Sequence, residues 1–133
     1  MKLGIMLDCS RNAVINFSAF KKMVDILSKL GYTNIRLYTE DTYEVEGEPY
    51  FGYLRGRFSI NEIQEMDKYA KSKGIELIPC IQTLAHLANV LKYAPYGNIR
   101  DIDDILLVND DRTYQLIDNM FKSISKAYST KNI

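Results

Sequence analysis

Apolar residues along the chain gather in three short runs that are typical of buried β-strands. The runs are Leu3–Leu7, Ile35–Tyr38 and Ile75–Ile81. Each run is mostly apolar rather than strictly alternating, which is the pattern of strands that are covered on both faces. Such strands occur in parallel sheets flanked by helices. The pattern therefore predicts an α/β fold.

Two helices are predicted between these strands. The first has apolar residues at helical spacing and ends at Gly31, because glycine is the usual stop just past a helix end. The second opens with a capping box, in which Ser59 and Glu62 can satisfy each other's unpaired backbone donors, and it runs to Gly74. The order of helix, glycine and strand thus occurs twice. Right-handed crossovers would make these strands parallel, with the helices on the outer side.

The part of the chain after the third strand predicts a short helix, a loop and a last long helix. The short helix carries His86, with Gln82 one helical turn earlier on the same side, and a loop follows around Pro95–Gly97. The last helix begins after Asn109–Asp111. Its inner stripe is expected at Tyr114, Ile117, Phe121, Ile124 and Tyr128.

We interpret residues 1–133 as one domain and its βαβαβ(α)α order as a partial TIM (β/α)8 barrel with about three βα units. Three parallel strands leave two open sheet edges, which are an aggregation hazard unless something covers them. Either the chain is the N-terminal portion of a larger barrel, or it pairs with another copy; the first explanation is favoured. The isolated piece is expected to self-associate through the open edges.

Composition excludes several classes of function. Lysine plus arginine (17) balance aspartate plus glutamate (17), so charge gives no reason to expect nucleic acid or a membrane surface as a partner. No apolar stretch approaches a membrane span and no signal peptide opens the chain, so the expected location is the cytoplasm. Cys9 and Cys80 are expected to be reduced thiols. With a single histidine, neither a metal nor a cofactor is required.

Polar side chains follow each predicted strand at the point where it ends. Asp8 and Arg11 follow the first strand, Glu40 and Asp41 the second, and Gln82 and His86 the third. Functional groups of parallel α/β folds collect where strands end and loops begin. We therefore expect the three clusters to converge on one surface, and we place the candidate site there.

Arg11 is a binding candidate at this surface. Its guanidinium can fork hydrogen bonds onto a carboxylate, a phosphate or a pair of vicinal sugar hydroxyls, and the alternative is an ion pair with Asp8 that only fixes the loop. Glu40 and Asp41 are adjacent, so on an extended segment they point in opposite directions and only one can face a pocket fully. We interpret them as hydroxyl-binding or orienting groups, with a loop-capping role as the alternative.

His86 is the only histidine of the chain, and it lies off the leucine stripe of its predicted helix, which frees it for a pocket. A lone histidine equally serves as a hydrogen-bonded structural residue. The acidic and aromatic loop Tyr43–Tyr53 is predicted on the same face, where aromatic rings suit the apolar side of a sugar. Its aromatic residues can instead pack the loop down, which is the favoured interpretation.

Three motifs taken together resemble glycoside hydrolase family 20, the β-N-acetylhexosaminidases. The motifs are Met6–Arg11, Leu37–Asp41 and Ile78–His86. The resemblance spans nearly the whole chain but corresponds only to the first three βα units of that family's barrel. It implies hydrolysis of terminal, non-reducing β-linked N-acetylhexosaminides, with the sugar's own acetamido oxygen as the nucleophile and retention of configuration.

The resemblance also implies roles for individual residues. The sugar-binding residues would be Arg11, Glu40, Asp41 and His86, supported by Asp8, Gln82 and Tyr43. Arg11 would bind the distal hydroxyls of the ring, and Gln82 departs from the aspartate that many members carry. The family's catalytic Asp-Glu pair ends a fourth strand that this chain does not contain. We therefore expect an enzyme as the parent protein, no catalytic residue in this chain, and no activity of the chain alone.

Two rival hypotheses come from other classes of protein. One is a non-catalytic carbohydrate-binding or interaction module that keeps the half-barrel without the chemistry. The other is a different barrel enzyme, such as an isomerase or aldolase, in which Arg11 grips a phosphate. A downstream strand that ends in Asp-Glu in the complete protein would favour the enzyme over the module. Activity of the complete protein on an aryl N-acetyl-β-glucosaminide, abolished in Arg11→Ala, would argue against the phosphate-gripping enzyme.

Overall fold

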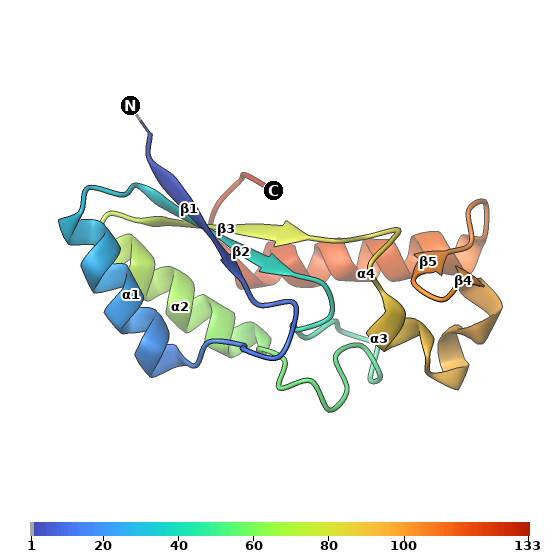
Figure 1. Ribbon diagram of the computed structural model, residues 1–133. Coiled ribbons are helices and arrows are strands. Elements are labelled where there is room, and N and C mark those ends of the chain that lie inside the picture. The colour runs from blue at the N-terminus through green and yellow to red at the C-terminus, as the bar shows by residue number, and fades with distance from the viewer. Residues whose placement is uncertain (1) are drawn as a thin grey trace.

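A three-stranded parallel sheet forms the centre of the computed structural model, which describes residues 2–133 (Figure 1). The strands are β1 (Gly4–Asp8), β2 (Asn34–Thr39) and β3 (Glu76–Ile81), and their order in the sheet is β1-β2-β3. The register places Asp8 beside Tyr38, and Tyr38 beside Cys80. The predicted α/β class and the predicted parallel strands are confirmed.

Helices cover one face of this sheet. They are α1 (Phe17–Lys29), α2 (Ile60–Ser72) and α4 (Asp111–Ala127). Figure 1 shows α1 and α2 side by side below the sheet, and α4 running past β3. Their apolar faces share one core with the inward side chains of β2, such as Ile35 and Leu37. Strand, helix and strand therefore repeat as in the first part of a (β/α)8 barrel.

The opposite face of the sheet has no helix over it among the described residues. Met6 and Arg36 are exposed on this face, and it lines an open hollow of about 820 Å³. In a closed barrel the corresponding face lines the interior. Within residues 2–133 the strands form no closed barrel, and the fold is a partial one.

Both long βα helices begin with a side-chain cap. Ser59 and Glu62 make the predicted capping box at α2, where the Glu62 carboxylate accepts a hydrogen bond from the Ser59 amide at 2.8 Å. The side chain of Asn16 accepts from the Ala19 amide at 2.9 Å and caps α1, which the sequence pattern did not predict. These caps fix where each helix leaves the loop before it.

The segment after β3 differs from the prediction. His86 does not lie on a helix; it lies in a bend with φ 61°, and the short helix α3 (Ala88–Leu91) starts after it. The 3-10 helix η1 (Ala94–Ile99) and an antiparallel hairpin of β4 (Arg100–Ile102) and β5 (Ile105–Leu106) then follow. Leucine spacing predicted a longer helix here, but Leu84 is exposed and only the later leucines reach the core.

The buried face of α4 also differs from the prediction in part. Tyr114 and Phe121 are exposed, Ile117 is half-buried, and Ile124 and Tyr128 are buried. The buried face consists of Thr113, Leu116, Met120, Ser123, Ile124 and Ala127. Small residues at this face let α4 pack closely, and two of the aromatic residues that guided the prediction, Tyr114 and Phe121, are exposed instead. Residues three and four positions apart lie on one face of a helix, and both the predicted stripe and the observed buried face have this spacing. The spacing alone therefore did not distinguish the two faces.

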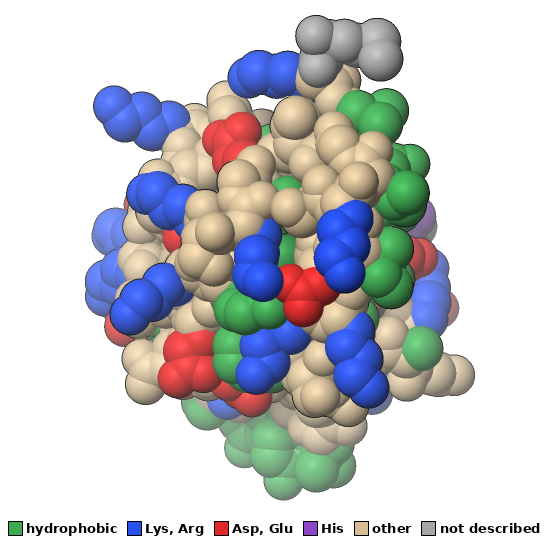
Figure 2. Space-filling model, turned by 90° about the vertical axis from the view of Figure 1, so that its left-hand side faces the viewer, with side chains coloured by type: hydrophobic (Ala, Val, Ile, Leu, Met, Phe, Trp, Pro, Cys, Tyr) green, Lys and Arg blue, Asp and Glu red, His purple; other side chains and the backbone are tan. Residues whose placement is uncertain are grey.

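The outer surface of the helices carries intermixed charges. Figure 2, which views the molecule from the left-hand side of Figure 1, shows lysine, arginine and acidic side chains interspersed on this face. Several are paired, as in the ion pair between Lys73 and Asp25 at 2.8 Å. Among residues 2–133, no helix is long and apolar enough to cross a membrane.

Candidate functional site

The ends of β1 and β2 meet in one polar network. A nitrogen of the Arg11 guanidinium lies 3.0 Å from an oxygen of the Glu40 carboxylate, across the exits of two neighbouring strands. The Glu40 side chain is 3% exposed, whereas the Arg11 side chain is 69% exposed. A buried anion thus holds one end of an exposed cation. The remaining N–H groups of Arg11 point to solvent, where a ligand with several oxygens could accept them.

Tyr38 is a member of this network that the sequence did not single out. Its hydroxyl donates to the other oxygen of the Glu40 carboxylate at 3.3 Å, so Tyr38 and Arg11 hold Glu40 from two sides. Burial and the nearby Glu40 carboxylate raise the pKa of Tyr38, so the hydroxyl stays protonated as a donor. The signal was present in the alternation of β2, because Arg36, Tyr38 and Glu40 share one face.

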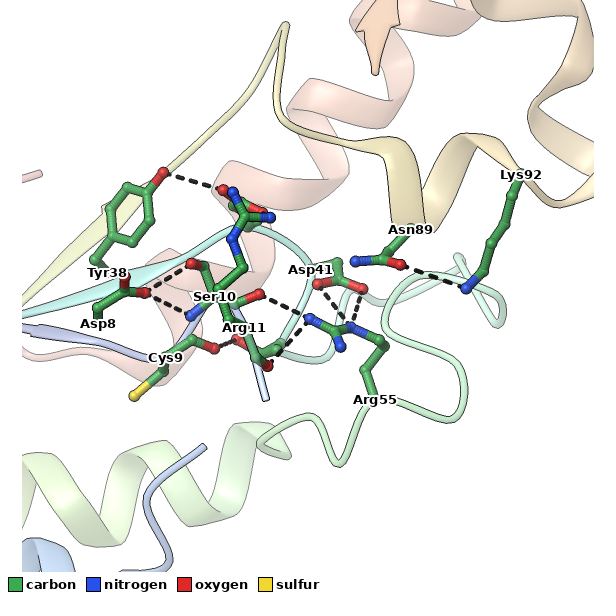
Figure 3. A network of polar contacts seen from close by, with 11 residues as sticks. Asp8, Cys9, Ser10, Arg11, Tyr38, Asp41, Arg55, Asn89 and Lys92 are labelled. Carbon is green, nitrogen blue, oxygen red and sulfur yellow. Dashed lines mark hydrogen bonds and ion pairs between the residues drawn. The ribbon is translucent and has the colours of Figure 1, made fainter. Parts of the chain in front are cut away.

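Asp8 fixes the turn that presents Arg11. Its carboxylate accepts hydrogen bonds from the Ser10 hydroxyl at 2.7 Å and the Ser10 amide at 2.8 Å (Figure 3). These two bonds, and then the charge of Arg11, hold the pKa of Asp8 below its usual value. The alternative of a direct Asp8–Arg11 ion pair is wrong, since the partner of Arg11 is Glu40.

Asp41 points away from Arg11, as expected for neighbours on an extended segment. Its buried carboxylate accepts from the Nε of Arg55 at 3.0 and 3.3 Å (Figure 3). The same guanidinium donates to the backbone oxygens of Ser10 at 2.7 Å and Arg11 at 3.3 Å. Arg55 was not predicted. Asp41 and Arg55 together clamp the exit of β1 onto the loop after β2, which places Glu40 rather than Asp41 beside Arg11.

The loop after β2 is packed against the network rather than free. Gly52 is buried with φ 68°, and a Cβ at this position would lie 2.3 Å from the backbone oxygen of Asp41. Phe51 is also buried, and Arg57 donates to its backbone oxygen. The interpretation that aromatic residues pack this loop down therefore holds for Phe51, whereas Tyr50 and Tyr53 are exposed.

Tyr43 lies in the core beneath the strand exits. Its ring packs edge-on against Phe51 with centroids 5.1 Å apart, and its hydroxyl has no hydrogen-bond partner among the described residues. Burial strongly raises the pKa of Tyr43. Its contacts give it a packing role, and they do not bring its hydroxyl to the surface that carries Arg11.

The exit of β3 contributes less than predicted. The Gln82 side chain lies close enough to the Tyr38 hydroxyl to oppose the rise of the Tyr38 pKa, and the backbone N–H of Gln82 donates to the backbone oxygen of Thr39 at 3.3 Å. His86 is exposed and hydrogen-bonds to no other residue in the described range. The predicted pairing of Gln82 with His86 on one helical turn is wrong, because no helix spans them.

Another buried carboxylate, that of Glu48, holds the far end of the loop. Glu48 accepts from Arg112 at 2.7 Å, from the Tyr96 hydroxyl at 3.1 Å and from Asn119 at 3.1 Å. The cluster thereby ties the loop to η1 and α4, and all of Glu48's partners are structural. No group of three or more potential metal ligands occurs within residues 2–133.

Comparison with known proteins gives the fold a context. No protein-family model matches the chain. The chain is 26% identical over 85 residues to human Hexosaminidase D, a match that covers 64% of this chain and 18% of that protein.

Solved structures match over more of the chain. An N-acetyl-β-hexosaminidase from Streptomyces plicatus superposes with a TM-score of 0.82 at 19% identity, and the match covers 96% of this chain and 30% of that one. A β-N-acetylhexosaminidase from Bacteroides fragilis gives 0.82 at 22%, covering 97% and 30%. A family 20 exo-β-N-acetylglucosaminidase from Vibrio harveyi gives 0.84 at 18%, covering 96% and 26%.

These matches concern only part of each enzyme, because the chain spans about a third or less of the proteins to which it is similar. Over that part, the chain has the fold of β-N-acetylhexosaminidases of glycoside hydrolase family 20. The resemblance predicted from the motifs at the strand exits is confirmed to that extent. The matches also agree with the predicted architecture, a partial TIM barrel.

Proposed function

We propose that residues 1–133 form the first three βα units of a β-N-acetylhexosaminidase barrel and supply part of its sugar-binding pocket. The observation that carries the proposal is the exposed Arg11 guanidinium, anchored by the buried Glu40 at the exit of β1. Support comes from the fold, since the similar structures are hexosaminidases, and one of them, from Vibrio harveyi, contains N-acetylglucosamine. The proposed ligand is therefore the terminal, non-reducing N-acetylhexosamine of a β-linked glycan.

Arg11 binds the distal hydroxyls of this sugar in the proposed pocket. A planar guanidinium offers parallel donors that match two neighbouring oxygens, and its fixed orientation lowers the entropy lost on binding. Glu40 and Tyr38 are positioning residues in this arrangement, because they hold Arg11 without needing to touch the ligand. His86 is proposed at the rim of the same pocket. Asp41 acts indirectly, through the Arg55 clamp on the backbone of Arg11.

The proposed reaction is hydrolysis with help from the substrate. The acetamido oxygen of the sugar attacks the anomeric carbon while the glycosidic bond breaks, and a general acid protonates the leaving oxygen. Water then opens the cyclic intermediate, and the product keeps its configuration. We assign no acid and no acetamido-orienting carboxylate among residues 2–133. In the resemblance these roles belong to an Asp-Glu pair at the end of a fourth strand.

The test is release of the chromophore from 4-nitrophenyl N-acetyl-β-glucosaminide by the complete protein. Arg11→Ala should lower kcat/KM by about a hundredfold, since it removes hydrogen bonds from a charged donor. Lys22→Ala is the control, because Lys22 is an exposed cation on α1, on the helical face of the sheet, and this variant should keep its activity.

Three results would contradict the proposal. Full activity of Arg11→Ala would remove Arg11 from the pocket. Binding of N-acetylglucosamine without any hydrolysis by the complete protein would favour the non-catalytic carbohydrate-binding module. Affinity for sugar phosphates, lost in Arg11→Ala, would instead favour the phosphate-gripping barrel enzyme.

A further inference from the structure

A groove lies at the opposite end of the sheet from the strand exits. It has a volume of about 310 Å³ and opens between the last turns of α2, the start of β3 and the chain after α4. Figure 1 shows the start of β3 at the end of the sheet away from the exits. We call this hollow the Asp67 groove, and it is lined by Asp67, Lys71, Ser129, Thr130 and residues 74–77.

Asp67 is the residue of this groove that packing does not explain. It lies on the buried face of α2 and is 8% exposed, yet its carboxylate has no hydrogen-bond or ion-pair partner among residues 2–133. Its oxygens are not sealed in the core, as the Tyr43 hydroxyl is, and they open on the groove. Removing a carboxylate from water costs free energy unless the carboxylate is paired. A cationic group that enters the groove would supply that pairing.

Two side chains that could pair with Asp67 do not do so. Lys71 follows one helical turn later, a spacing at which opposite charges commonly pair, but it is exposed and makes no ion pair among the described residues. Burial, Cys9 and Asp67 together raise the pKa of Tyr128, so the Tyr128 hydroxyl lies near Asp67, but no hydrogen bond joins the two side chains within residues 2–133. The Asp67 carboxylate therefore remains available to a ligand.

The rest of the groove also favours a cation. Glu76 accepts hydrogen bonds at Oε1 from the Thr130 hydroxyl at 2.5 Å and from the Asn132 side-chain amide at 2.7 Å. These bonds hold the pKa of Glu76 below its usual value, so Glu76 stays an anion. The C-terminal end of α2, which reaches the groove at Lys71, carries the partial negative charge of a helix end. Two carboxylates and a helix end thus face the single charge of Lys71.

We propose that the Asp67 groove binds the guanidinium group of an arginine side chain. A planar guanidinium can donate two parallel hydrogen bonds to the carboxylate of Asp67, and its other N–H groups match the hydroxyls of Ser129 and Thr130. Ile75 and Leu77 supply apolar surface for the alkyl stem. The volume is at the lower limit of small-molecule sites, about 300 Å³, which suits one side chain. This site is separate from the proposed sugar pocket and does not depend on it.

The test is a titration of the complete protein by saturation-transfer difference NMR. The probes are free arginine and N-acetylargininamide, which represents an arginine within a polypeptide. Asp67→Asn keeps the shape of the side chain and should weaken the binding of both probes at least about tenfold, because it removes a charged acceptor. Glu65→Gln is the matched control, since Glu65 is an exposed carboxylate on α2 outside the groove, and it should leave the affinity unchanged.

Two further probes test which chemistry the groove recognises. N-acetylcitrullinamide has the shape of the arginine probe but a neutral urea group, and it should bind at least about tenfold more weakly. N-acetyllysinamide carries its charge on a compact ammonium without the planar fork, and it should also bind more weakly. Equal binding of the citrulline compound would overturn recognition of charge, and equal binding of the lysine compound would overturn recognition of a guanidinium.

Stability supplies a readout that a structural role of Asp67 would reverse. Without ligand, Asp67→Asn should unfold at the same or a higher urea concentration than the unmodified protein, because it removes an unpaired buried charge. A lower midpoint would show that Asp67 has a structural partner in the complete protein, and would overturn the inference. Ser129→Phe places a large ring at the groove without changing Asp67, so it should also weaken binding and provides a second variant.

The outcomes are distinct from those of the proposed function. Asp67→Asn should hydrolyse the aryl glycoside as the unmodified protein does, because the groove lies at the other end of the strands. If neither arginine compound gives a saturable signal, the inference is overturned and the proposed sugar pocket is unaffected. If both bind, the tighter one identifies the source of the guanidinium, as a free amino acid or as an arginine within a polypeptide.

Discussion

The exits of β1 and β2 differ from the exit of β3, although all three were predicted to form one cluster. At β1 and β2, two buried carboxylates each engage an arginine, and Tyr38 adds a third contact. At β3, only Gln82 reaches this network, and His86 is exposed in a bend. One side of the candidate site is therefore built by the chain itself. The other side presents a side chain that no described residue holds.

The difference follows from what surrounds each strand. β2 has a neighbour on both sides, so its exit residues meet side chains from β1 and from the loop that folds back over them. β1 and β3 are both edge strands of this sheet, but the loop after β2 folds back onto the exit of β1 through Arg55, whereas the chain after β3 leaves toward α3 and the β4–β5 hairpin. The contacts of a strand exit therefore depend on the loop that packs over it as well as on the neighbouring strands. This contrast predicts that substitutions at the first two exits affect stability, whereas those at the third affect ligand binding alone.

The largest expected effect is that of Asp41→Ala. The substitution leaves the Arg55 guanidinium without its anion, and the Arg55 side chain is only 16% exposed. We expect a loss of about 3 kcal/mol in the free energy of unfolding, because an uncompensated charge stays buried. Urea unfolding followed by circular dichroism measures it.

Two variants test whether that loss comes from the clamp. Asp101→Ala is the matched control, since Asp101 is an exposed aspartate on β4, and it should change stability by less than about 0.5 kcal/mol. Asp41→Asn keeps the shape and removes the charge, so it should lie between the two. Equal stability of Asp41→Ala and the unmodified protein would mean that the clamp does not hold the two exits together.

Much of the fold could be predicted from the sequence, because short sequence patterns specified the same elements that the packed structure contains. The apolar runs, the two glycine stops and the Ser59–Glu62 capping box each specify an element by short-range chemistry, and each is present in the structure. The segment after β3 lacked such agreement. Its leucine spacing imitates a helix, while the left-handed residue His86 and the η1 turn depend on contacts with distant parts of the chain.

The candidate site was likewise predictable only where its residues are placed by local sequence. Arg11 and Glu40 were found because each stands where a strand ends. Arg55 was missed because it lies in an irregular loop, and only the folded chain brings it to Asp41 and to the backbone of Ser10. Tyr38 was missed for a different reason, since the alternation of β2 already placed it on the same face as Glu40. A partner that comes from a loop can be found only in the tertiary structure. A partner two residues away on the same strand can be deduced from the alternation of side chains between the two faces of the sheet.

A smaller effect is expected from Asp8, as a dependence of stability on pH. The folded pKa of Asp8 is lowered by its hydrogen bonds from Ser10, so its contribution is present above the unfolded pKa of about 3.9. It is lost as the pH falls through the folded pKa. Asp8→Asn should therefore be less stable than the unmodified protein by at most about 1 kcal/mol at pH 6, and the gap should close toward pH 2. A gap that widens in acid would reverse this assignment.

The smallest effect on stability is expected at His86, and it is the sharpest test of the contrast. Asparagine tolerates the left-handed conformation that His86 adopts, so His86→Asn leaves the backbone unstrained. His86 is exposed and makes no hydrogen bond within the described residues. The substitution should therefore change the free energy of unfolding of the protein by less than about 0.5 kcal/mol. Hydrolysis of the aryl glycoside by the complete protein should nevertheless fall about tenfold, since the proposed pocket loses a rim contact to the sugar. A loss of stability with unchanged hydrolysis would make His86 a structural residue, and the third strand exit would then have no part in the pocket.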